Sequence, residues 1–336
     1  MKNAKRNTII LLLIAVVVMY FILKDNFQSI VENLWLANKW LILFSLCLVC
    51  LFWLFRAISL YLIVKRYKRK IRFRVIFHQT LITQFFNGIT PFATGGEPMQ
   101  VYMLTKSGVK VANATNIIVQ EFIMYQIALV LIGFLSLILN FKFNLCSVTP
   151  VLGNMIVLGF VINIIIGLFL IFVSFSKKFS KFVVKLALKL GVKFKIIKDI
   201  EKTTNSLNEK LEEYNESGTM LEKNKKLFFN CVMLNFAALV IFYLIPYFIF
   251  LSLGYEIGLM QVFVSSSFIL LIGNFVPIPG GSVGIEGAYL LFFEKFLPTA
   301  PLNASLIIWR GITYYFGIIV GGISLGFFKG DVKKWE

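Results

Sequence analysis

Two apolar stretches of this 336-residue chain are broken by similar sequences, Asn87-Gly88-Ile89-Thr90-Pro91-Phe92-Ala93-Thr94-Gly95-Gly96-Glu97 and Asn274-Phe275-Val276-Pro277-Ile278-Pro279-Gly280-Gly281-Ser282-Val283-Gly284-Ile285-Glu286. Each contains, in order, an Asn, a Pro, a Gly-Gly pair and a Glu. Proline removes a backbone donor, and glycine adopts conformations that other residues avoid. A helix is therefore predicted to stop at each sequence and to restart near its Gly-Gly pair.

The composition around these breaks is that of a membrane protein. Apolar residues make up 58% of the chain and charged residues 15%, whereas soluble domains carry about 25% charged residues. So few charges cannot cover a water-exposed surface, which excludes a soluble enzyme. Because apolar runs of about 20 residues form transmembrane helices, the sequence predicts an all-α integral membrane protein.

Apolar runs of helix length recur along the whole chain. Six of them are predicted to cross the membrane completely. Their bounds are 8–23, 40–64, 112–140, 151–173, 227–253 and 301–328. The two broken stretches, 75–105 and 259–297, are predicted to be re-entrant helical hairpins, each of which enters and leaves on one side of the membrane.

Lys and Arg residues are distributed unequally under this topology. With both termini in the cytoplasm, 28 of the 34 Lys and Arg residues lie on the cytoplasmic side and 4 on the other side. The remaining two, Arg56 and Arg310, lie within the membrane. This distribution follows the positive-inside rule, and it explains most of the net charge of +18 without a nucleic acid partner. The predicted location is the bacterial inner membrane, with a multi-pass topology.

The chain is expected to be one membrane domain that contains an inverted repeat. The first hairpin opens toward the cytoplasm within residues 40–140, and the second opens toward the outside within residues 227–328. Broken apolar segments at corresponding positions of two opposed halves are typical of a transporter's binding site. The breaks are therefore the predicted site.

A basic insert separates the two repeats. Residues 176–226 begin with lysines spaced four apart among apolar residues, which predicts an amphipathic helix on a membrane surface. A charged, Glu-containing segment follows. We expect the cytoplasmic face to attract anionic lipid, because each basic residue near such a surface contributes about 1 kcal/mol.

Glu97 and Glu286 are expected in the first turns of the helices that restart after the breaks. The free N–H groups and the positive dipole end of such a helix favour an anion. In an alternative interpretation, each glutamate only caps its own helix.

Arg56 and Arg310 each lie alone in a long apolar run. A charge at the centre of a membrane helix costs about 2.5–3.5 kcal/mol, so a partner is expected. The partner is either a glutamate (Glu97, Glu121 or Glu286) or the phosphate of a lipid, whose oxygens match the guanidinium fork. An ion pair that opens when the substrate arrives would combine the two interpretations.

The predicted substrate-binding residues combine the broken backbone with the charged and polar side chains near it. They are Arg56, Asn87, Thr94, Gly95, Gly96, Glu97, Glu121, Asn274, Gly280, Gly281, Glu286 and Arg310. The sequence contains no catalytic motif, no phosphate-binding loop and no His/Cys metal cluster. No catalytic residue, metal ion or cofactor is predicted.

On Asn87 to Pro98 and Pro277 to Gly287, the chain resembles the lysylphosphatidylglycerol synthase transmembrane-region family, also called the flippase-like domain family. This domain is the membrane part of bacterial multiple peptide resistance factors. The resemblance implies a flippase-like transporter that moves a lipid with a phospho- or aminoacyl-phospho- head group between leaflets. Such transport would contribute to resistance against cationic antimicrobial peptides.

The resemblance also leaves an enzymatic alternative. Fuller members join this membrane domain to a cytosolic domain that transfers lysine from lysyl-tRNA to phosphatidylglycerol, and stand-alone members are commonly labelled phosphatidylglycerol lysyltransferase. Eight residues follow Phe328, and an insert of about 50 residues is small for such a domain, so we expect no transferase domain here. A homo-oligomer or a lipid-modifying enzyme is a possible partner.

Overall fold

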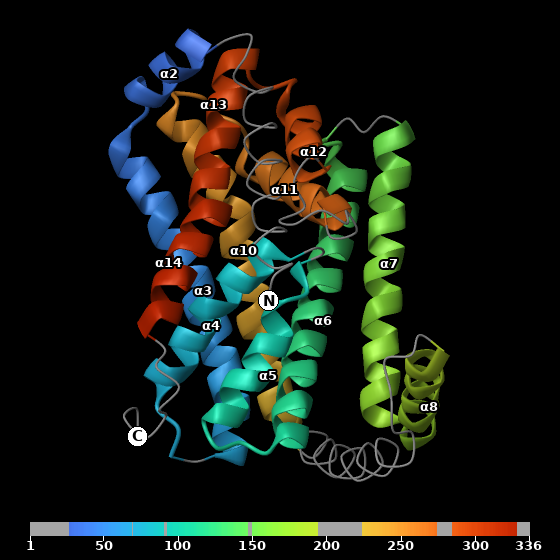
Figure 1. The fold of residues 1–336 in the computed structure, drawn as a ribbon. Helices are drawn as coiled ribbons and strands as arrows, with labels where there is room; N and C mark the ends of the chain where they lie inside the picture. Colours follow the sequence, from blue (N-terminus) through green and yellow to red (C-terminus); the bar gives the residue numbers. More distant parts are fainter. Residues whose placement is uncertain are drawn as a thin grey trace.

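A computed structural model describes residues 27–68, 70–90, 93–146, 150–193, 224–273 and 284–327. These residues form helices joined by turns, without a β-strand among them (Figure 1). The helices are α2 (Phe27–Leu36), α3 (Lys39–Tyr67), α4 (Phe73–Ile89), α5 (Gly96–Lys106), α6 (Val111–Phe143), α7 (Pro150–Phe175), α8 (Lys177–Lys193), α10 (Lys225–Ser252), α11 (Leu259–Gly273), α12 (Gly284–Phe293), α13 (Thr299–Arg310), the π-helix η3 (Gly311–Tyr315) and α14 (Phe316–Phe327).

Five helical rods are long and apolar enough to cross a membrane. They are α3, α6, α7, α10 and the continuous rod Thr299–Phe327 formed by α13, η3 and α14. At 1.5 Å per residue, a 29-residue helix such as α3 is about 43 Å long, longer than a hydrocarbon core of about 30 Å. The all-helical, multi-pass prediction is confirmed for these five spans, and the predicted span 8–23 lies outside the described residues.

The first predicted break is present. Helix α4 ends at Ile89 and α5 begins at Gly96, and Ala93 between them has a left-handed φ of 52°. Of the second break, the structure describes the flanking ends only: α11 stops at Gly273 and α12 starts at Gly284. In Figure 1, α4 and α5 lie in the lower half of the view and α11 and α12 in the upper half.

The two ends of the α4–α5 pair lie together at one end of the molecule. Lys68, which follows α3, donates a hydrogen bond from Nζ to the carbonyl of Ser107, which follows α5, at 2.6 Å. The chain therefore enters α4 and leaves α5 at the same end of α3.

The two ends of the α11–α12 pair lie together at the opposite end. Phe250 near the end of α10 packs edge-on against Phe293 at the end of α12, with ring centroids 4.8 Å apart. The backbone N–H of Asn38, at the start of α3, donates to the carbonyl of Ser252 at 2.7 Å. Since α3 begins here and ends near Lys68, the two helix pairs point in opposite directions along α3.

The packing relates the two helix pairs in a reciprocal way. Helices α3 and α10 contact each other at the centre, α6 contacts α11, and α14 contacts α4. Each helix that follows a broken pair thus packs against the first helix of the other pair. Helices α7 and α8 form the right edge of Figure 1, where α7 contacts α6 and α11 and α8 contacts α7.

Two elements were not anticipated from the sequence. Helix α2 lies between the predicted spans 8–23 and 40–64, where no helix is predicted, and it packs against α13. The π-helix η3 interrupts the last span, which was interpreted as a regular helix.

Candidate functional site

Side chains of α4 hold the start of α5 at the first break. Asn87 Oδ1 accepts a hydrogen bond from the backbone N–H of Gly96 at 2.8 Å, and Thr90 Oγ1 accepts one from Gly95 at 2.9 Å. A Cβ on Gly96 would overlap Asn87 Oδ1, and a Cβ on Gly95 would lie 2.6 Å from Thr90 Cγ2. The Gly-Gly pair is required because the α4 side chains approach the backbone this closely.

These contacts correct the expectation of an anion site at free N–H groups of α5. The N–H groups of Gly95 and Gly96 already have partners, and the carboxylate of Glu97 accepts a hydrogen bond from its own backbone N–H. Glu97 therefore fits the alternative in which it caps its own helix. Thr94 is exposed in the turn beside them. Nothing in the hydropathy pattern reveals which acceptor an N–H group finds across a turn.

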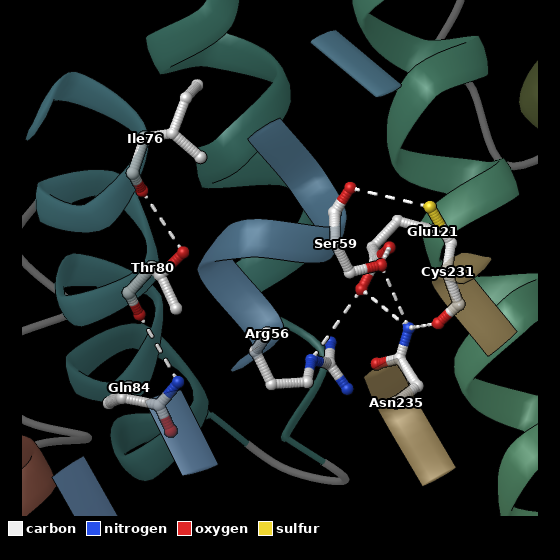
Figure 2. Close-up of polar contacts among 8 residues, drawn as sticks. All are labelled: Arg56, Ser59, Ile76, Thr80, Gln84, Glu121, Cys231 and Asn235. Carbon is white, nitrogen blue, oxygen red and sulfur yellow. Dashed lines mark hydrogen bonds and ion pairs between the residues drawn. The ribbon is translucent and has the colours of Figure 1, made fainter. Parts of the chain in front are cut away.

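Glu121 lies at a buried junction of three helices (Figure 2). Ser59 on α3 donates from Oγ to Glu121 Oε2 at 2.6 Å, and Asn235 on α10 donates from Nδ2 to Glu121 Oε1 at 3.3 Å. Arg56 Nε lies 3.7 Å from the same Oε1, beyond ordinary hydrogen-bond distance. Glu121 therefore has hydrogen-bond donors that are independent of the arginine.

Arg56 is held less tightly than its partner. Its guanidinium carbon lies 4.1 Å above the ring of Tyr125, and its side chain remains 22% exposed. The charge of Arg56 also acts on the carboxylate of Glu97. Arg56 and Glu121 thus form the first charged cluster, in which the ion pair is loose.

Asn235 leaves one polar atom of this cluster without a partner. Its Nδ2 has three acceptors for two hydrogens: Ser59 Oγ at 3.1 Å, Glu121 Oε1 at 3.3 Å and the Cys231 carbonyl at 3.0 Å. Its buried Oδ1 has no hydrogen-bond partner among the described residues. Figure 2 shows this oxygen turned toward the side on which Arg56 lies.

Glu286 and Arg310 form the second cluster, and this ion pair is tight. Arg310 Nε and Nη2 lie 2.8 Å and 2.6 Å from Glu286 Oε1, and both side chains are about nine-tenths buried. The guanidinium also lies 5.5 Å from the ring centre of Trp309 and 5.1 Å from that of Tyr314. The predicted pairing of Arg310 with a membrane glutamate is present in the structure.

The predicted residues therefore fall into two clusters and one turn. Asn87, Gly95 and Gly96 maintain the geometry of the first break. The predicted Asn274, Gly280 and Gly281 lie outside the described residues. In the part of the chain that the structure describes, no group of three or more His, Cys, Asp or Glu side chains is placed to hold a metal ion.

Sequence reasoning missed several polar partners. Ser59, Tyr125, Asn235 and Tyr314 surround the two arginines. An amide such as Asn235 in a membrane span does signal a buried polar contact. Because lipid chains offer no hydrogen-bond partner, the amide must bond to another part of the protein. Serine and tyrosine are ordinary in membrane helices and give no comparable signal.

Comparison with known proteins gives relatives over most of the chain. It is similar to a UPF0104 membrane protein of Archaeoglobus fulgidus, with 26% identity over 301 residues that cover 87% of each chain. It is also similar to a UPF0104 membrane protein of Methanothermobacter thermautotrophicus, with 22% identity over 271 residues, 78% of this chain and 77% of that one. Both names state a membrane location and no activity.

Residues 8–321 match the family model described as the lysylphosphatidylglycerol synthase TM region. This match spans both breaks, both charged clusters, four of the five membrane rods and most of the fifth, Thr299–Phe327. The chain is a multi-pass membrane protein that belongs to the lysylphosphatidylglycerol synthase TM region family.

Proposed function

We propose that the protein moves a lipid with a phosphate-bearing polar head between the two leaflets of a cell membrane. Family membership supports a role connected with lipids. Buried charges on membrane helices are expensive and commonly mark substrate paths. The broken backbone between α4 and α5 adds support, because such breaks occur where protein or water satisfies the backbone.

The proposal includes two re-entrant hairpins in an inverted repeat. The α4–α5 pair has its ends together near Lys68, and the α11–α12 pair has its ends together near Ser252, at the other end of α3. The reciprocal contacts of α6 with α11 and of α14 with α4 are those of two halves related by a two-fold axis. Such repeats alternate access to a central site.

We place the end of the molecule that carries α8 in the cytoplasm. Six lysines and no acidic residue lie in Lys177–Lys193. The last turn of α3, which carries Lys65 and Arg66, lies with α8 in the lower half of Figure 1. Phe182 and Leu186 are exposed on α8 beside the lysines, as in helices that lie among anionic head groups. Because the two relatives are archaeal, we propose a cell membrane without restricting it to bacteria.

Replacing three lysines of α8 tests this surface. The triple variant Lys181→Gln, Lys185→Gln and Lys189→Gln should retain fewer phosphatidylglycerol molecules after purification, since each lysine contributes about 1 kcal/mol. Lipid retained by the purified protein is measured by native mass spectrometry. A matched variant that replaces Lys39, Lys142 and Lys295 should retain wild-type amounts. Equal retention by both variants would rule out α8 as the anionic-lipid surface.

The contrast between the two arginines is the observation that carries the proposal. Arg310 donates twice to Glu286 within 2.8 Å, whereas Arg56 approaches Glu121 only at 3.7 Å. Because Ser59 and Asn235 already satisfy Glu121, Arg56 can turn toward an incoming phosphate without leaving a carboxylate without a partner. We therefore assign Arg56 as the first phosphate ligand and the Glu286–Arg310 pair as an ion pair that opens later in the cycle.

The test is leaflet-resolved lipid movement in proteoliposomes of the purified protein. Fluorescent phosphatidylglycerol, lysyl-phosphatidylglycerol and a polyprenyl phosphate are offered separately, with and without proton or sodium gradients. Arg56→Gln should slow the movement of the transported lipid about tenfold or more, because a hydrogen bond to a charged group is worth about 1.5–3 kcal/mol. Arg66→Gln, an exposed arginine on the same helix, should remain within about twofold of wild type.

Two results would count against the proposal. A folded Arg56→Gln protein with the wild-type rate would remove Arg56 from the site. If no lipid moves under any gradient, the transport function itself is wrong. Transfer of lysine from lysyl-tRNA to phosphatidylglycerol by the same preparation would then favour the enzymatic alternative.

A further inference from the structure

The π-helix η3 divides the last membrane rod immediately after Arg310. Helical turns of this kind are rare and are frequent at functional sites. A Cβ on Gly311, the first residue of the turn, would meet nothing within 4 Å. Gly311 itself has helical angles, φ −52° and ψ −50°, so a side chain at this position would fit both the space and the backbone.

Tyr314 connects this turn to the first break. Its hydroxyl donates a hydrogen bond to the carbonyl of Gly88 at 2.8 Å. Gly88 lies in the last turn of α4, where carbonyls lack a partner within the helix. The ring of the same tyrosine has its centre 5.1 Å from the guanidinium carbon of Arg310. One side chain thus contacts both the arginine of the second cluster and the end of α4.

The backbone of α4 packs directly on the rod that contains η3. A Cβ on Gly88 would lie 2.5 Å from Ile318 Cγ1, and a Cβ on Gly321 would lie 2.5 Å from the Leu81 carbonyl oxygen. At Gly88 the Ile318 side chain of α14 lies against the α4 backbone, and at Gly321 the two backbones meet directly. A shift of the rod at η3 must therefore displace α4, because close-packed elements transmit displacement.

We infer that Tyr314 couples the Glu286–Arg310 ion pair to the first break. When the ion pair opens, Arg310 and the π turn rearrange together, and Tyr314 releases the Gly88 carbonyl. The last turn of α4 then loosens, together with the Asn87 contact that holds Gly96. Tyr314 is a positioning residue in this scheme. The coupling is a property of the fold and needs no lipid substrate, so its test is independent of the proposed transport.

Amide hydrogen exchange of the full-length protein in nanodiscs tests the coupling. The wild type is compared with Glu286→Gln, Tyr314→Phe and the double variant, in peptides that cover Gly88 and Gly96. Glu286→Gln should raise exchange there by several-fold, although it is on α12. Tyr314→Phe should raise exchange in the same peptides, and the double variant should match Tyr314→Phe alone. Tyr315→Phe, the neighbouring tyrosine of the π turn, is the matched control and should leave exchange unchanged.

The inference is wrong if Glu286→Gln leaves exchange at Gly88 and Gly96 unchanged, or if its effect persists in full when Tyr314 is phenylalanine. Gly311→Ala provides a second variant, because its Cβ enters open space and fold disruption is not expected. Alanine favours a regular helix, so Gly311→Ala should reduce the exchange response to Glu286→Gln. If Glu286→Gln raises exchange as much in the Gly311→Ala background as with the glycine, the π turn does not transmit the change to α4.

Discussion

Glu121 is buried at the junction of α3, α6 and α10, and hydrogen bonds from Ser59 and Asn235 replace the water that its carboxylate loses. A buried charge with a missing donor is far less stable than one whose oxygens are all paired. The need for a hydrogen-bond donor to Glu121 explains why Asn235 is present in an otherwise apolar part of α10.

Asn235→Ala should therefore destabilise the protein by about 1 kcal/mol, the typical worth of a hydrogen bond between membrane helices. Thermal unfolding in detergent measures the change. Asn230→Ala is the matched control, because Asn230 is exposed on the same helix and should unfold like the wild type. The assigned role of Asn235 fails if the two variants unfold at the same temperature.

At the scale of elements, glycines determine how closely α14 approaches α4. Gly321 faces the α4 backbone, since its Cβ would lie 2.5 Å from the Leu81 carbonyl oxygen and 2.8 Å from the Phe85 nitrogen. The next residue, Gly322, would meet only the Phe85 ring, at 3.5 Å. Gly321 and Gly322 are adjacent on α14 and therefore point in different directions around the helix. The first faces the α4 backbone and the second faces the Phe85 ring.

Gly321→Ala should lower the free energy of unfolding by about 1–3 kcal/mol, because a methyl group cannot fit against backbone without moving a helix. Gly322→Ala should be neutral or stabilising, since its contact is ordinary and alanine is the better helix former by about 1 kcal/mol. Unfolding of the two variants is compared in the same detergent. Equal stability would mean that α14 does not pack on α4 in this register.

At the scale of the whole molecule, the ends of the two broken pairs lie at opposite ends of α3. Lys106 is the last residue of the first pair, and Glu256 precedes the second. Both are exposed. The proposed topology places Lys106 in the cytoplasm and Glu256 outside.

Cysteine labelling in intact cells tests this topology. In a background without the native cysteines, Glu256→Cys should react with a membrane-impermeant maleimide and Lys106→Cys should not. After the cells are opened, both should react. If both positions react in intact cells, or neither does, the two pairs do not open on opposite sides.

The sequence alone determined the membrane class, the five described spans and the position of the first break. These features depend on local properties: an apolar run of helix length is driven into lipid wherever it occurs, and Asn, Pro and Gly-Gly end a helix without distant partners. The proposed orientation in the membrane is likewise a local property, because it depends on where Lys and Arg residues lie along the chain.

Only the tertiary structure decided which arginine pairs with which glutamate. Arg56 lies near Glu121, and Arg310 pairs with Glu286, because pairing depends on how each helix is rotated in the bundle. The donors from Ser59 and Asn235, and the contact from Tyr314 to Gly88, likewise join residues more than 60 positions apart. Such contacts leave no periodic signal along the sequence. A single hydrogen bond requires only that its two residues lie close in space, and it places no requirement on the residues beside them in the chain.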